Sequence, residues 1–201
     1  AEPIARLTYA QLQSLSAVGM QVLHESAVEP LRAAGIPLHI RSTHQPEAPG
    51  TLIGCPDTGG GTDGAVGFAA RRGIAMLRLT VLAPQAAEDV RQTVQQAGVK
   101  ILHSAEGFEQ MTLLLEADAA ALHLAAEQLA RRLPRTQIKL RENLSLLAAL
   151  QGGKGALPRV IAAIQDAGVP VHDLAQTDAC LLMIVNDSQF ETALRAAYEA
   201  R

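Results

Sequence analysis

Two stretches with the same beginning, AGVKILH at residues 97–103 and AGVPVHD at residues 167–173, lie 70 positions apart in the chain. The same offset places Leu113-Leu114-Leu115 on Met183-Ile184-Val185. Around each pair, an apolar strand pattern is followed by a helical pattern, two further strand patterns and a second amphipathic helix. This β-α-β-β-α order is typical of a ferredoxin-like module. The sequence therefore predicts an α+β fold that contains two copies of one module.

The repeat places the expected elements of each copy. In the first copy we expect strands 76–82, 99–103 and 110–116, and helices 85–97 and 119–132, with Asp118 as the cap of the second helix. In the second copy we expect strands 144–150, 169–173 and 179–185, and helices 156–167 and 188–200, with Asp187 before the last helix.

Each module needs a fourth strand to complete its sheet. Residues 137–141 supply one for the first copy, but no strand pattern follows the last helix of the second. An unused strand pattern at 65–69 precedes the first copy, and Arg71-Arg72-Gly73 resembles a turn between it and Met76. We expect strand 65–69 to complete the second sheet close to Met183, since an unpaired edge would favour aggregation. The two modules would then be interleaved.

The first 64 residues have a different organisation. Thr8 and Gln11 form a capping-box pattern that opens a helix ending near Gly19. A helix at 26–34, a strand at 36–41 and a short strand at 51–53 follow. The proline and glycine content of residues 54–64 indicates a linker. The expected boundaries are thus 1–53 for an α/β segment, 54–64 for a linker, and 65–141 and 142–201 for the two modules.

Composition excludes several classes of protein. Hydrophobic residues make up 48% and charged residues 18%, and no apolar run reaches the ~20 residues of a membrane helix. The net charge is −3 and basic residues are scattered, so nucleic-acid binding is not expected. Cys55 and Cys180 have neither metal-ligand nor disulfide-framework spacing, which favours a cytoplasmic protein with no metal site. Residue 1 is Ala, and we expect the numbered chain to be a piece of a longer protein.

No complete catalytic site is indicated, because the six histidines and the carboxylates fall in separate elements. One loop is a candidate ligand site, since it joins a strand to a helix N-terminus, where free backbone N–H groups favour an anion. Its residues are Gly152, Gly153, Lys154 and Gly155. The alternative is that these glycines only allow the chain to turn.

Three stretches in the N-terminal part carry a resemblance to a known family. They are GMQVLH at 19–24, GIPLHIRST at 35–43 and PGTLI at 49–53. In this order and spacing they resemble the end of the catalytic domain of aspartate kinases. That family continues with two interleaved ACT domains, which are small ferredoxin-like modules that bind regulatory amino acids. The resemblance therefore extends over the whole chain and implies a C-terminal portion of an aspartate kinase.

The resemblance implies a reaction, and it assigns catalysis to a part of the kinase that these residues do not include. Aspartate kinases phosphorylate the side-chain carboxylate of L-aspartate with ATP and Mg²⁺, in the synthesis of lysine, threonine and methionine. Gln21, Arg41 and Ser42 correspond to the nucleotide-binding remnant of the catalytic domain, although the family commonly has Lys where this chain has Gln21. Because the N-terminal catalytic half is absent from these residues, we expect no cofactor in the chain and no catalytic activity from it alone.

The resemblance also implies an effector, which would be lysine, threonine or methionine. Its carboxylate would lie at the helix that starts near Ala156, beside the glycine loop. Its ammonium group would meet Asp173, Gln176 or Thr177. The family often has Asn at the positions of Lys100 and Pro170, so effector control is expected to be altered or lost. Association into a homodimer through the ACT sheets is expected as well.

Two alternatives stay open from the sequence. The chain could be a free-standing ACT-type amino-acid-binding module without a kinase role, which the presence of Gln21 favours. It could also be an architectural dimerisation module that has lost its ligand.

Overall fold

The two long strands β4 (Phe68–Thr80) and β7 (Gln137–Leu150) organise the chain. In this computed structural model the residues described are 4–18, 23, 25–54, 67–80, 83–150, 156–176 and 180–200. They form two compact units. Unit 1 comprises Ala1–Ala70, Leu147–Ile184 and Glu191–Arg201, and unit 2 comprises Arg71–Leu146 and Val185–Phe190. Each long strand begins in one unit and ends in the other.

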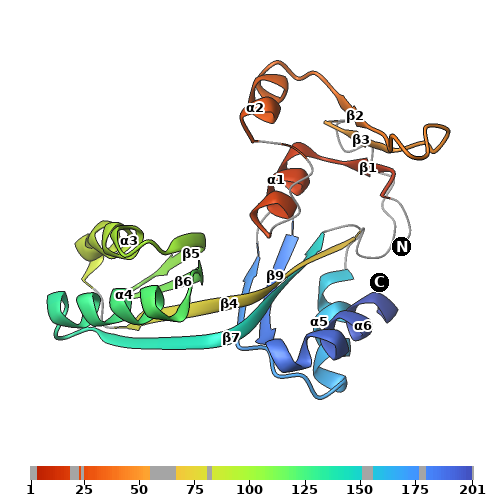
Figure 1. Ribbon diagram of the computed structural model, residues 1–201. Coiled ribbons are helices and arrows are strands. Elements are labelled where there is room, and N and C mark those ends of the chain that lie inside the picture. Colours follow the sequence, from red (N-terminus) through yellow and green to blue (C-terminus); the bar gives the residue numbers. More distant parts are fainter. Residues whose placement is uncertain are drawn as a thin grey trace. The chain divides into compact units, whose positions relative to one another are not determined.

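The strand order of the main sheet is β5-β6-β4-β7-β9-β8 (Figure 1). One module consists of β4, α3 (Ala87–Gln96), β5 (Lys100–Gly107), β6 (Gln110–Glu116), α4 (Ala119–Arg132) and β7. The other consists of β7, α5 (Ala156–Asp166), β8 (Asp173–Gln176), β9 (Cys180–Asn186), α6 (Phe190–Glu199) and β4. Because β4 and β7 serve both modules, the predicted α+β fold of interleaved ferredoxin-like modules is confirmed.

The fourth strand of the second module comes from the predicted segment, but its neighbour differs from the prediction. The backbone N–H of Leu150 donates to the carbonyl of Gly67, and β7 lies between β4 and β9. The expected pairing of 65–69 beside Met183 is therefore wrong, since the fourth strand of this topology lies beside the first strand and not the third. Residues 65 and 66 lie outside the described part of the chain.

Two predicted interruptions are absent from these strands. The predicted turn at Arg71-Arg72-Gly73 is wrong, because β4 continues through it. Strands 137–141 and 144–150 are likewise one strand, β7, so the expected boundary between residues 141 and 142 falls inside a strand. Gly73 and Asn143 both adopt a left-handed backbone conformation, with φ values of 67° and 56°, and lie 70 positions apart. A bend within each strand thus replaces the expected break.

One strand of the second copy lies later than predicted. The expected strand 169–173 is displaced to β8, Asp173–Gln176. Pro170 has no backbone N–H to give to a sheet, whereas Lys100 at the equivalent position begins β5. The ladder with β9 starts where the N–H of His172 donates to the carbonyl of Ile184.

Unit 2 has a core between its sheet and two helices. Figure 1 shows α3 and α4 side by side on one face of this part of the sheet. Alternate residues of each strand point toward that face, as the two-residue strand period requires. The main buried members are Leu77, Leu79, Met111, Leu113 and Leu115 from the strands and Val90, Val94, Leu122 and Leu129 from the helices.

The N-terminal part of unit 1 has a small sheet in the order β1-β3-β2, made of Arg6–Leu7, Thr51–Ile53 and Leu38–Ile40. Helix α1 (Tyr9–Ala17) has the predicted capping box at its start, and α2 is Glu25–Ala33. A Cβ atom on Gly67 would lie 2.6 Å from Cδ1 of Ile4, so this N-terminal part packs closely on the start of β4. Elsewhere in unit 1 the rings of Phe68 and Tyr198 are 4.8 Å apart.

Candidate functional site

The predicted effector site involves the N-terminus of α5 and the strand β8. Helix α5 begins at Ala156 as predicted, and its first turn contains no acidic residue. Its backbone N–H groups therefore face no competing carboxylate from that turn, which suits the binding of an anion. The predicted loop Gly152, Gly153, Lys154 and Gly155 lies outside the described residues, as does Thr177.

Asp173 and Gln176 occupy the two ends of β8. Asp173 pairs with Ile184 of β9 and Gln176 pairs with Leu181. Side chains alternate along a strand, so residues three positions apart point to opposite faces of the sheet. Oδ1 of Asp173 accepts a 2.9 Å hydrogen bond from the backbone N–H of Leu174. The two proposed ammonium acceptors therefore lie on one strand but face different sides of it.

The equivalent position in the first copy is chemically different. Helix α3 carries Glu88 and Asp89 in its first turn, and Ala83, before the 3-10 turn Pro84–Ala86, makes no side-chain cap. Two carboxylates there already interact favourably with the helix dipole and would repel a ligand carboxylate. The first copy is thus the less suitable anion site.

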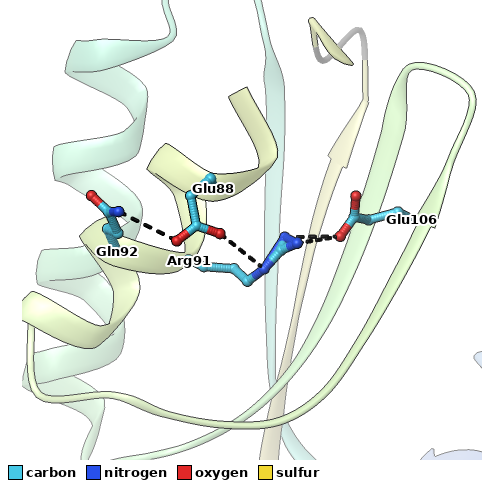
Figure 2. A network of polar contacts seen from close by, with 4 residues as sticks. All are labelled: Glu88, Arg91, Gln92 and Glu106. Carbon is cyan, nitrogen blue, oxygen red and sulfur yellow. Dashed lines mark hydrogen bonds and ion pairs between the residues drawn. The ribbon is translucent and has the colours of Figure 1, made fainter. Parts of the chain in front are cut away.

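A polar network also occupies the strand of the first copy (Figure 2). Glu106 is the counterpart of Gln176, 70 positions earlier, and pairs with Met111 as Gln176 pairs with Leu181. Arg91 donates to Oε1 of Glu106 over 2.8 and 2.6 Å and lies 3.7 Å from Glu88. The amide of Gln92 donates to Glu88 over 3.3 Å. Glu106 is therefore engaged by α3, which distinguishes the two copies.

The two described members of the predicted nucleotide-binding remnant lie in the loop after β2. The guanidinium of Arg41 donates to the carbonyl of Pro46, and Oγ of Ser42 accepts from the N–H groups of His44 and Gln45 over 3.3 Å each. Both side chains thus organise the loop. Gln21 lies outside the described residues, and the assignment of all three to nucleotide binding stays a prediction.

One polar cluster was missed by the sequence analysis. Asp187, expected directly before the last helix, begins the 3-10 turn Asp187–Gln189 that precedes α6, and Asn186 at the cap position of this turn makes no side-chain cap bond. Asp187 accepts hydrogen bonds from Arg72 over 3.1 and 2.8 Å and from Ser145 over 2.5 Å. These bonds, the Arg72 pair first, and a further bond from the Gly73 backbone lower the pKa of Asp187 to about 2. Its partners are 115 and 42 positions away, so no local pattern indicates them.

Two further observations concern metal sites and membrane-spanning helices. Within the described ranges, no group of three or more His, Cys, Asp or Glu side chains could hold a metal ion. In the same part of the chain no helix has the length and apolar character that crossing a membrane requires.

Known aspartokinases are similar to this chain over nearly its whole length. Aspartokinase 3 of Bacillus subtilis is 24% identical over 210 residues, which cover 98% of this chain and 46% of that protein. Aspartate kinase Ask_Ect of Stutzerimonas stutzeri is 24% identical over 206 residues, covering 98% of this chain and 43% of that protein. The predicted resemblance to aspartokinases is confirmed. The chain spans less than half the length of these two relatives, and no family model matches it.

Solved structures of aspartokinases share the fold. The aspartate kinase of Clostridium acetobutylicum has a TM-score of 0.81 at 23% identity, covering 99% of this chain and 49% of that one. The regulatory subunit of aspartate kinase from Thermus flavus has a TM-score of 0.58 at 21% identity and covers 67% of this chain and 96% of its own. E. coli aspartokinase III in complex with lysine and aspartate has a TM-score of 0.72 at 18% identity, and the match covers 98% of this chain and 46% of that one. The similarity thus includes a separate regulatory subunit of aspartokinase.

Proposed function

We propose that this chain is the regulatory portion of an aspartokinase and that its second module binds a free amino acid. The resemblance implies three candidate ligands, namely lysine, threonine and methionine. The α-carboxylate would lie at the start of α5, and Asp173 or Gln176 would accept from the ammonium group. ATP and Mg²⁺ would act in a catalytic part of a longer protein, so the chain alone is not expected to phosphorylate aspartate.

One difference between the two copies favours the second copy as the ligand site. The first turn of α5 has no acidic residue, while that of α3 has Glu88 and Asp89. Glu106 in the first copy is held by Arg91, while its counterpart Gln176 is an exposed neutral amide. A zwitterionic ligand would therefore meet less electrostatic repulsion at the second copy.

A pair of matched substitutions tests this placement. Gly155→Asp would put a carboxylate where the ligand carboxylate is proposed to bind, and we expect at least a roughly tenfold weaker affinity in calorimetry. Gln85→Asp makes the same change in charge 70 positions earlier, beside α3, and should leave the affinity unchanged. If Gly155→Asp binds lysine, threonine and methionine as the unmodified chain does, the placement at α5 is wrong. If the unmodified chain gives no heat with any of the three, the effector itself is excluded.

Association through sheet edges is the second part of the proposal. The main sheet ends in β5 on one side and β8 on the other. The eight residues of β5 give the longer row of main-chain groups that could pair with a second copy. We expect a concentration-dependent dimer in analytical ultracentrifugation, and monomer alone at micromolar concentration would contradict it.

A further inference from the structure

The two left-handed residues of β4 and β7 mark where these strands bend. Gly73 has φ of 67° and Asn143 has φ of 56°. Gly73 has no heavy atom within 4 Å of the position that a Cβ would take, so crowding does not impose the conformation. A left-handed residue interrupts the regular extended backbone of a strand. Glycine adopts this conformation without steric cost, whereas at Asn143 it needs support from the surroundings.

That support comes from the carboxylate of Asp187. It receives the two hydrogen bonds of Arg72, next to Gly73 in β4, and one from Ser145, two positions after Asn143 in β7. The Gly73 N–H donates to it as well. Ser145 is fully buried, while the side chain of Asp187 is 28% exposed. One carboxylate therefore connects both bends.

Phe190 completes this arrangement. The guanidinium carbon of Arg72 lies 5.1 Å from the centre of the Phe190 ring, which is a cation–π distance. Arg72 thus contacts both the carboxylate of Asp187 and the ring of Phe190. Both Asp187 and Phe190 belong to the segment Val185–Phe190, which is separated in sequence from the rest of unit 2.

The position of these contacts along the chain is informative. The chain passes between the two units after Ala70, Leu146, Ile184 and Phe190. Arg72, Ser145 and Asp187 all belong to unit 2, and each lies within three residues of one of these points. The three side chains therefore join every segment of unit 2 that continues into unit 1.

We propose that Asp187, with Arg72 and Ser145, is a clamp that couples the unfolding of the two units. With the clamp intact, loss of unit 2 releases β4, β7 and the Val185–Phe190 segment together, so the two units unfold in one transition. Without it, each unit keeps its own hydrophobic core and unfolds at its own denaturant concentration. The proposal concerns the fold alone and does not depend on the binding of an effector.

The test is Asp187→Asn in the whole 201-residue chain. Unfolding in urea is followed by pulsed hydrogen exchange and mass spectrometry, with α5 reporting on unit 1 and α4 on unit 2. We expect coincident midpoints in the unmodified chain and midpoints separated by roughly 0.5 M urea or more in the variant. Ser145→Ala removes one of the bonds and should give a smaller separation, which keeps the test valid if Asp187→Asn does not fold.

Arg71→Gln is the matched control. Arg71 precedes Arg72 in β4, and its guanidinium makes a 2.7 Å ion pair with Glu116 within unit 2. This change should lower the urea midpoint, but the midpoints measured at α4 and at α5 should remain coincident. Coincident midpoints in both clamp variants would overturn the proposal, as would an equal separation in Arg71→Gln.

Discussion

The guanidinium of Arg91 donates two hydrogen bonds to the same carboxylate oxygen of Glu106 and so joins α3 to β5 (Figure 2). The side chains are 31% and 48% exposed, so water and salt weaken the pair without removing it. Glu106 is the residue of the first copy that corresponds to Gln176 in the second, so this contact occupies its carboxylate. A single ion pair therefore contributes both to packing and to the difference between the two copies.

Loss of this ion pair should have a modest cost. We expect Arg91→Ala to lower the free energy of unfolding by about 0.5–1 kcal/mol, because a partly exposed pair contributes no more than that. Arg131→Ala removes the more exposed pair with Glu127, 3.5 Å long, and should cost less. Urea unfolding of both variants checks the order, and in 1 M salt the cost of Arg91→Ala should shrink. A larger effect of Arg131→Ala would contradict this assignment.

The Asp187 carboxylate should make stability depend on pH. Its pKa is about 2 in the folded protein against an ordinary value of 3.8. A lowered folded-state pKa stabilises the protein above the ordinary pKa, and this stabilisation is lost as the pH falls from about 4 to about 2. After allowance for solvent screening of the exposed Arg72, the contribution is about 1–2 kcal/mol at neutral pH.

The measurement compares the unmodified chain with Asp187→Asn in urea at pH 6, 4 and 3. The difference in free energy of unfolding should be largest at pH 6 and should narrow at each step down. A difference that stays constant over this range would show that the carboxylate charge contributes nothing.

The capping box of α1 offers a local test. The N–H of Gln11 donates to Oγ1 of Thr8 over 3.1 Å, and the N–H of Thr8 donates to the side chain of Gln11 over 2.8 Å. Thr8→Ala should cost about 1 kcal/mol of unfolding free energy, since it leaves a helix N–H without its partner. Thr8→Ser keeps the hydroxyl and should cost little. Equal losses in thermal unfolding would mean that the hydroxyl is not the stabilising group.

The two left-handed residues should respond to different extents to a change of side chain. Gly73→Ala places a Cβ on a left-handed backbone and should lower the unfolding free energy by about 1–2 kcal/mol, although there is space for the methyl group. Asn143→Gly relieves the same conformation but gives the unfolded chain more freedom, so its net effect should lie within about 0.5 kcal/mol. Denaturant titration of the two variants distinguishes these outcomes. A neutral Gly73→Ala would show that β4 can straighten at this position.

Features that depend on near neighbours in the chain were predicted from the sequence. Thr8 and Asp118 cap their helices as expected, because a capping bond reaches only three residues ahead. Strand β6 and helix α4 have the predicted bounds, and the 70-residue repeat reappears in the left-handed glycines Gly98 and Gly168. Of the candidate site, the start of α5 was predicted for the same reason.

Features that depend on distant partners were decided by the tertiary structure alone. The sequence around Arg71-Arg72-Gly73 resembles a turn, but β4 continues because neighbouring strands pair with it. The place of residues 67–69 beside β7 follows from the strand order of the completed sheet, which no single segment encodes. The sequence placed Asp187 only as the residue before the last helix. Its hydrogen-bond donors Arg72 and Ser145 reach it only when three separate segments meet.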